Sequence, residues 1–152
     1  MAVTPVPEGY HTATPYLVVR GGVRAMEFYK RAFGAVEMLR MPMPDGRLGH
    51  AEIKIGDSII MFADEAPEHG ATSPDTIGGV ASSLMLYVHD VDSAFTQALA
   101  AGATEVQPLT DKFYGDRSGT VKDPFGHQWT IATHVEDVAP EEMQKRLAQG
   151  AK

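Results

Sequence analysis

The stretch GHAEIKI, residues 49–55, carries the two side chains whose types and spacing best suit chemistry. His50 and Glu52 are separated by one residue, so in a strand they point to the same face. An imidazole beside a carboxylate can act as a general acid/base pair, or it can supply two ligands to a divalent metal ion. The same pattern also fits a polar sheet face that carries an ion pair. The sequence leaves these three interpretations open.

Other metal-binding signals are weak. The chain has six histidines and no cysteine, which excludes thiolate metal sites, disulfides and cysteine nucleophiles. The other histidines are spread over the N-terminal segment, a loop-like stretch and the ends of predicted strands and helices. None forms an H-E-x-x-H or H-x-H pattern, so each is interpreted as a surface or hydrogen-bonded histidine.

Composition restricts the class of protein. A chain of 152 residues with 43% hydrophobic content can bury the core of one ordinary domain. Its formal charge of -7 and lack of a basic run argue against nucleic acid or an anionic membrane as a partner. No apolar run approaches a membrane span, and the N-terminus does not resemble a signal peptide. We therefore expect a cytoplasmic protein.

The elements that must position His50 and Glu52 recur in the same order along the chain. In each half a strand, an amphipathic helix and two further strands follow one another, and a glycine ends each helix. The first half reads as strands at 14–19, 49–56 and 58–63 with a helix at 23–35; the second half reads as strands at 82–88, 118–123 and 127–133 with a helix at 91–103.

This order predicts an α+β fold of two βαβββ modules, which form a curved mixed sheet with a concave cleft and carry their helices outside. The modules span about 10–64 and 82–135, and are separated by a Pro- and Gly-rich linker at 65–81. Residues 136–152 read as a helical tail that starts at Pro140. An offset of about 69 residues pairs the equivalent positions of the two modules: Thr14 with Ser83, and Met61 with Thr130.

Four stretches in this order resemble a known family, over roughly residues 10–135: TPYLVVRGGVRAMEFYKRAFGA, GHAEIKIGDSIIMFAD, LYVHDVDSAFTQALAAGA and GTVKDPFGHQWTIATH. The chain resembles the glyoxalase/bleomycin resistance/dioxygenase superfamily, also called vicinal oxygen chelate, and within it the PhnB-like branch. The resemblance implies the fold but no single activity. Members with metal chemistry hold one divalent ion with His, Glu or Gln at four strand positions.

By position, the resemblance assigns those four places to Thr14, Met61, Ser83 and Thr130. None of these side chains offers the imidazole or carboxylate that divalent metals prefer. We therefore expect a cleft without the family metal and no other cofactor. The alternative is one divalent ion displaced to the region of His50 and Glu52.

The predicted cleft is amphipathic. Tyr16, Met85 and Tyr87 share the inferred cleft face, and a loop read at residues 108–119 adds Phe113, Tyr114 and Arg117. Aromatic rings and thioethers suit a flat, partly apolar molecule, and the guanidinium could meet an acidic group. The prediction is a protein that binds a small amphipathic or aromatic molecule.

The alternative is a glyoxalase-like lyase or isomerase, or a dioxygenase, that uses the region of His50 and Glu52. Because neither small module can cover both faces of its sheet, we also expect a homodimer.

Overall fold

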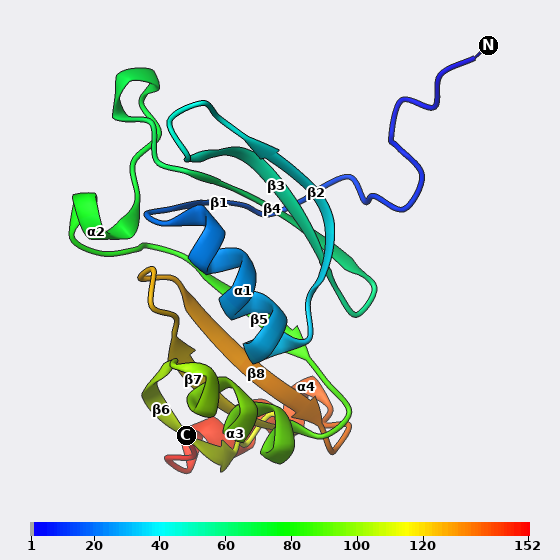
Figure 1. Cartoon of the computed structure of the whole chain (residues 1–152). Helices are drawn as coiled ribbons and strands as arrows, with labels where there is room; N and C mark the ends of the chain where they lie inside the picture. The colour runs from blue at the N-terminus through cyan, green and yellow to red at the C-terminus, as the bar shows by residue number, and fades with distance from the viewer. Residues whose placement is uncertain (1) are drawn as a thin grey trace. The chain divides into compact units, whose positions relative to one another are not determined.

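The computed structural model describes residues 2–152 and confirms the α+β fold of two βαβββ modules. The first compact unit runs to Gly79 and the second begins at Val80. Each unit contains its own four-stranded mixed sheet and a long helix (Figure 1).

The first module orders its strands β1-β4-β3-β2, with β1 parallel to β4 and the other pairs antiparallel. A 3₁₀ turn, η1, and one short helix, α2, follow the last strand. The bounds are β1 (Tyr16–Val19), α1 (Gly22–Phe33), β2 (Val36–Pro42), β3 (Leu48–Ile55), β4 (Ser58–Asp64), η1 (Pro67–His69) and α2 (Pro74–Ile77).

The second module repeats this topology as β5-β8-β7-β6 and adds a C-terminal helix, α4. The predicted offset is found in the strand pairing, because Tyr16 pairs with Met61, and Met85 with Thr130, each 69 positions later. The bounds are β5 (Ser83–Tyr87), α3 (Val91–Ala101), β6 (Thr104–Asp111), β7 (Asp116–Lys122), β8 (Gln128–His134) and α4 (Pro140–Ala148).

The helix α1 forms because its apolar residues recur at helical spacing and Gly34 accepts the left-handed conformation that ends it, with φ 66°. Met26 and Tyr29, on the apolar side of this helix, are fully buried. Val23 is not part of the buried stripe, although its spacing predicts this, since it is 44% exposed. Its turn of the helix instead buries Ala25.

The two faces of the first sheet differ in chemistry. Ala51, Ile53 and Phe62 are fully buried on the face that α1 covers. The alternate residues of β3, His50 and Glu52, therefore lie on the other face, as strand alternation predicts. Within its own module, the second sheet is likewise covered on one face by α3 and buries Trp129 completely.

Two strands lack a clear sequence signal. β2 and β6 are the outer strands of their sheets, largely exposed, and their pairing is interrupted by register shifts. The segment 108–119, read as one loop, is mostly strand: β6 continues to Asp111 and β7 begins at Asp116. Only the four residues between them form the turn.

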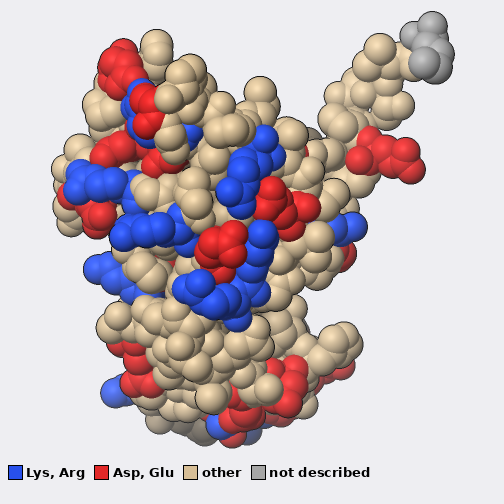
Figure 2. Space-filling view, viewed as in Figure 1, with Lys and Arg blue, Asp and Glu red and all other residues tan. Residues whose placement is uncertain are grey.

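Charged side chains of both signs are mixed over α1 of the first module (Figure 2). Glu37 accepts bonds from Lys30 and Arg40, for example, both at 2.9 Å. Within residues 2–152, no helix is both long and apolar enough to cross a membrane.

Candidate functional site

The open face of the first sheet carries a chain of four hydrogen-bonded side chains. His50 Nε2 lies 2.8 Å from Glu52 Oε2, and His50 Nδ1 lies 2.8 Å from the hydroxyl of Tyr16. The other oxygen of Glu52 accepts the hydroxyl hydrogen of Tyr10, which comes from the N-terminal segment. The chain Tyr10–Glu52–His50–Tyr16 thus connects three parts of the module.

The ionised carboxylate of Glu52 sets the direction of these bonds. Burial raises the pKa of Glu52, but the hydrogen bonds from Tyr10 and His50 outweigh burial, so the pKa lies below its ordinary value. An ionised carboxylate only accepts, so His50 donates through Nε2. In the neutral imidazole, Nδ1 then accepts the hydroxyl hydrogen of Tyr16. Burial, and next the charge of Glu52, raise the pKa of Tyr16 and keep it protonated.

Apolar side chains surround this polar chain. The register places Tyr16, Met61, Glu52 and Leu39 in one row across the four strands. Tyr16 and Leu39 are 51% and 41% exposed. Met41, which pairs with His50, is 53% exposed. The face therefore combines one buried carboxylate with exposed aromatic and thioether surface, which suits a flat and partly apolar molecule.

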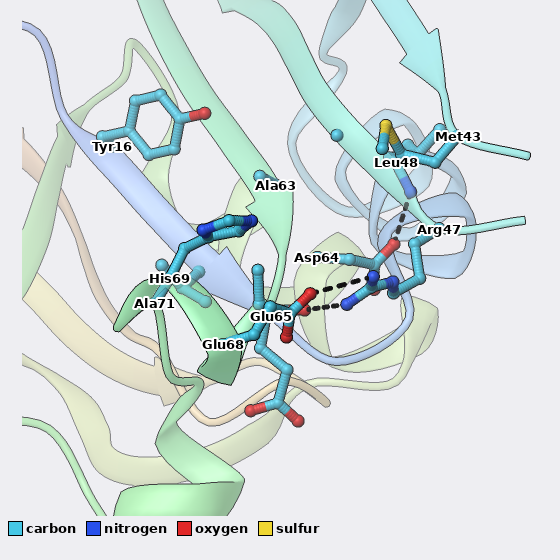
Figure 3. A pocket seen from close by; sticks show the side chains of 13 residues that line it. Tyr16, Met43, Arg47, Leu48, Ala63, Asp64, Glu65, Glu68, His69 and Ala71 are labelled. Carbon is cyan, nitrogen blue, oxygen red and sulfur yellow. Dashed lines mark hydrogen bonds and ion pairs between the residues drawn. The ribbon is translucent and has the colours of Figure 1, made fainter. Parts of the chain in front are cut away.

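A pocket of about 310 Å³ opens beside this face (Figure 3). It is lined by Tyr16, Val18 and Ala63 of the sheet and, among others, by Met43 and His69. Figure 3 shows the Tyr16 and His69 rings on the same side of the pocket. Tyr16 belongs both to the lining of this pocket and to the hydrogen-bonded chain, so a molecule in the pocket would contact a side chain that is also bonded to His50.

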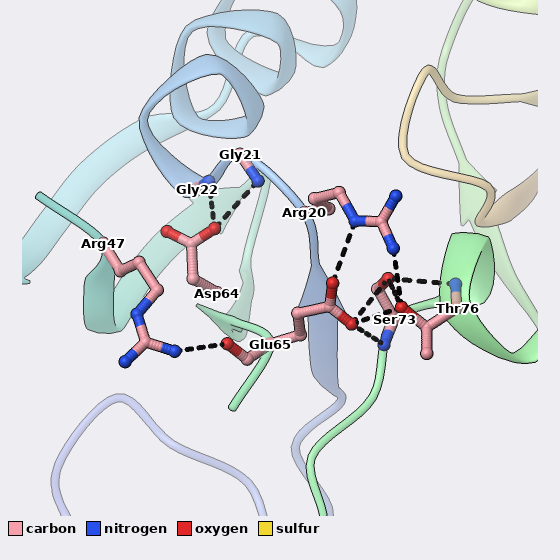
Figure 4. A network of polar contacts seen from close by, with 8 residues as sticks. All are labelled: Arg20, Gly21, Gly22, Arg47, Asp64, Glu65, Ser73 and Thr76. Atoms are coloured by element: carbon pink, nitrogen blue, oxygen red, sulfur yellow. Dashed lines mark hydrogen bonds and ion pairs between the residues drawn. The ribbon is translucent and has the colours of Figure 1, made fainter. Parts of the chain in front are cut away.

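Glu65, which lines the pocket, is the centre of a network of polar contacts (Figure 4). Its carboxylate accepts bonds from Thr76 Oγ1 at 2.6 Å, Arg20 Nε at 2.9 Å, and both the amide and the hydroxyl of Ser73 at 3.1 Å. These bonds, those from Thr76 and Arg20 first, lower the pKa of Glu65 to about 2. The chain that follows Glu65 is therefore tied back to it at Ser73 and Thr76, and the residues between them that line the pocket include His69.

In the second module, the structure brings together Met85, Tyr87 and Thr130, three of the predicted site residues. Met85 pairs with Thr130, and both share the open sheet face with Tyr87. Ser83 is the first residue of β5 and is exposed on the same face. The hydroxyl of Thr130 lies 2.9 Å from that of Thr120.

Tyr87 begins a second hydrogen-bonded chain. Its hydroxyl donates to Asp116 Oδ2 at 2.8 Å, and Asp116 Oδ1 lies 2.8 Å from His134 Nδ1. The other ring nitrogen of His134 lies 2.7 Å from Asp137 Oδ1. These two carboxylates, that of Asp116 first, raise the pKa of His134. Each module therefore links a tyrosine, a carboxylate and a histidine on its open face.

The remaining predicted residues lie elsewhere in the second module. Phe113 and Tyr114 form the turn between β6 and β7, with their rings edge to face at 5.2 Å. Arg117 lies on the opposite side of β7 from Asp116 and is bound by Asp92 of α3 at 2.9 Å and by Asp111 at 3.3 Å. Its guanidinium is thus engaged on the helix side, apart from Tyr87.

The four positions that the family resemblance assigns to a metal do not fit a divalent ion. Thr14 is a half-buried residue just before β1, Met61 is a thioether, and Ser83 and Thr130 are neutral hydroxyls. Neutral hydroxyls and a thioether are poor ligands for zinc, nickel, iron or manganese. Across residues 2–152, no group of three or more His, Asp or Glu side chains is arranged to hold a metal ion.

Sequence reasoning does not identify two contributors to this site. Tyr10 stands in a segment without helix or strand, so no periodicity directs it toward Glu52. His69 lies in the Pro- and Gly-rich linker, where histidine reads as a surface residue. Their only signal is residue type: a tyrosine and a histidine within otherwise small and polar stretches.

The chain was compared with known families and proteins, and it matches one family over most of its length. Residues 11–131 match the description Glyoxalase/Bleomycin resistance protein/Dioxygenase superfamily. An uncharacterized protein of Mycobacterium bovis is 41% identical over 138 residues, which cover 89% of this chain and 91% of that protein.

Solved structures of other proteins share this fold. TioX from Micromonospora sp. ML1 superposes with a TM-score of 0.64 at 30% identity, covering 81% of this chain and 99% of that chain. The PhnB protein from Bacillus cereus shares the fold, with a TM-score of 0.63 at 20% identity, covering 81% of this chain and 99% of that chain. The chain belongs to the glyoxalase/bleomycin resistance protein/dioxygenase superfamily.

Proposed function

We propose that this protein binds a small, partly apolar and aromatic molecule on the open face of its first module, without a metal ion. The observation that carries the proposal is the double role of Tyr16, which lines the pocket of about 310 Å³ and is hydrogen-bonded to His50. A volume of this size suits a small organic ligand. Met43 in its lining, and the exposed Met41 that pairs with His50, offer the adaptable apolar surface that such a ligand needs.

The hydroxyl of Tyr16 favours a ligand that carries a hydrogen-bond donor. While His50 is neutral, the hydroxyl hydrogen of Tyr16 is used by His50 Nδ1, so the Tyr16 hydroxyl can only accept a hydrogen bond from a ligand. Three carboxylates line the pocket against one guanidinium, that of Arg47, and this excess of negative charge disfavours an anionic ligand. A neutral or cationic compound that carries an aromatic ring meets both conditions.

A thermal-shift screen of aromatic compounds and divalent metals tests this proposal. A ligand that binds only the folded chain stabilises it by about 2.7 kcal/mol at one hundred times its dissociation constant. We expect at least one aromatic compound to raise the melting temperature, and Tyr16→Ala to abolish the shift. Val106→Ala, which trims an exposed side chain on β6 of the second module, serves as the control and should keep the shift.

Two results would contradict the proposal. One is the absence of any shift with aromatic compounds, and the other is a shift that survives in Tyr16→Ala. Stabilisation by micromolar nickel or zinc that is lost on changing both His50 and Glu52 to Ala would instead place a displaced metal on β3. The metal-free part of the proposal would then be abandoned.

A second candidate function is metal-free acid/base catalysis of the lyase or isomerase type. The observation that favours it is the pair of 2.8 Å hydrogen bonds that joins His50 to Glu52 and to Tyr16. His50 can act as a general base on a carbon acid, with Glu52 stabilising the imidazolium that forms. Exchange of the α-hydrogen of a pocket-sized hydroxyketone for solvent deuterium tests this, and His50→Ala should abolish it. Absence of exchange in the unaltered protein argues for binding alone.

A further inference from the structure

The carboxylate of Glu52 is already hydrogen-bonded to a phenol group, the side chain of Tyr10. Tyr10 donates its hydroxyl hydrogen to Glu52 Oε1, while Oε2 is bound by His50. Glu52 is only 7% exposed, so its oxygens have little access to water and depend on these two donors. The open sheet face thus contains an acceptor for an aromatic hydroxyl group, and Tyr10 occupies it.

The segment that delivers Tyr10 is loosely held. Residues 2–15 contain neither helix nor strand, and Val3 and Val6 are 86% and 45% exposed. The amide of Tyr10 bonds only locally, to the carbonyl of Pro7 at 3.0 Å. Releasing such a segment from the sheet restores conformational entropy to its residues, which offsets part of the lost hydrogen bond. An external phenol can therefore compete with Tyr10.

The surroundings of the acceptor suit an aromatic ring as well as a hydroxyl. Met61 and Leu39 are the cross-strand neighbours of Glu52. The rings of Tyr16 and His50 lie next to it, with centroids 5.5 Å apart. The hydrogen bond to Glu52, with a smaller contribution from burial, raises the pKa of Tyr10, so the donor remains protonated. A bound phenol would be held in the same state.

We propose that Tyr10 occupies a subsite for an aromatic hydroxyl group, and that the ligand of this face is a phenol that displaces Tyr10 from Glu52. This inference rests on the proposed function and specifies the ligand class. Tyr16 connects the pocket with the Glu52 subsite, since it lines the pocket and is bonded to His50, which contacts Glu52. A ligand whose apolar part enters the pocket would extend its hydroxyl past Tyr16.

A matched pair of probes tests the inference. Binding of p-cresol and of its methyl ether, p-methylanisole, is measured by NMR titration on the unaltered chain, on Tyr10→Phe and on His11→Ala. The ether keeps the ring but has no hydrogen to donate. His11 is an exposed neighbour of Tyr10 in the same segment, so His11→Ala controls for changes in the segment itself.

We expect p-cresol to bind more tightly than the ether in all three proteins. We expect Tyr10→Phe to strengthen p-cresol binding about tenfold, because the competing hydrogen bond to a charged group is removed. His11→Ala should bind like the unaltered chain. Glu52→Gln should reduce the preference for p-cresol, since a neutral amide accepts a weaker hydrogen bond than a carboxylate.

The experiment distinguishes failure of the phenol subsite from failure of the proposed function. Equal binding of p-cresol and the ether would overturn the phenol subsite but leave the pocket proposal intact, since both probes would still bind. Unchanged p-cresol affinity in Tyr10→Phe would show that Tyr10 does not compete, and would also overturn the inference. If neither probe binds any variant and the aromatic screen gives no shift, the proposed function fails together with it.

Discussion

Asp64 and Thr133 stand 69 positions apart, at equivalent places in the two modules, and each binds the backbone at the start of its module's long helix. Asp64 Oδ1 accepts the amide hydrogens of Gly21 and Gly22 at 2.8 and 2.9 Å, and its Oδ2 accepts that of Leu48 at 2.7 Å. Thr133 Oγ1 accepts the amide hydrogen of Val91 at 2.9 Å. The last strand of each βαβββ unit thereby satisfies amides that a helix start leaves without partners.

Asp64→Ala should destabilise the protein by about 2 kcal/mol, because three backbone amides lose their acceptor. The matched change Thr133→Val removes only the bonds to Val91 and to the carbonyl of Val88, and should cost about 1 kcal/mol. Urea unfolding followed by circular dichroism measures both. Equal costs for the two variants would contradict the importance of the three-amide arrangement.

Gly22→Ala should also destabilise the chain, although alanine in a helix is ordinarily better than glycine by about 1 kcal/mol. A methyl group at position 22 would lie 2.6 Å from Asp64 Oδ2 and 3.0 Å from Leu48 Cβ, so the carboxylate would have to move off its amides. Val23→Ala, at the next, exposed position of α1, is the control and should be near neutral. A rise in melting temperature for Gly22→Ala would contradict the observed packing.

Glu65 should make stability dependent on pH in the acid range. Its pKa is lowered from 4.5 to about 2, chiefly by the bonds from Thr76 and Arg20. Because the folded-state pKa is depressed, this contribution is present above about pH 4.5 and is lost as pH falls toward 2. Glu65→Gln should melt at a lower temperature than the unaltered chain at neutral pH. The two melting temperatures should converge near pH 2, and a constant difference would contradict this assignment.

The contribution of His134 to stability should have the opposite pH dependence, since it is lost as pH rises. Its pKa is raised by the carboxylates of Asp116 and Asp137. Because the folded-state pKa is raised, its contribution is present below the ordinary value of 6.5 and is lost as pH rises through the raised pKa. In Asp116→Asn, the imidazole proton resonances of His134 should titrate at lower pH. The same titration midpoint in both proteins would show that Asp116 does not hold the charged form.

We also predict that the protein forms a homodimer, since each sheet is covered by a helix of its own module on one face only. Tyr16 and Tyr87 are 51% and 63% exposed on the open faces. Multi-angle light scattering at micromolar concentration should report twice the 16.4 kDa mass of one chain. A mass of one chain would contradict the prediction.

The sequence by itself determined the repeat, the order of the first strand, the helix and the last two strands in each module, and the two faces of the inner strands. Ala51 and Ile53 alternate with His50 and Glu52, so burial of the apolar pair fixes the side to which the polar pair points. The outer strands β2 and β6 could not be placed in this way. They pair on one edge only, are mostly exposed and contain register shifts, so no period of two is imposed on their residues.

Only the tertiary structure decided which polar groups meet. Tyr10 and Glu52 are 42 residues apart, and Arg117 is bound by Asp92 on the helix side rather than presented to the open face. Glu65 gathers Arg20, Ser73 and Thr76 from two separate segments. The alternation of apolar and polar residues along a strand indicates which face each side chain lies on, because burial follows that alternation. The partner of a polar group depends instead on how distant segments are brought together, which no local period encodes.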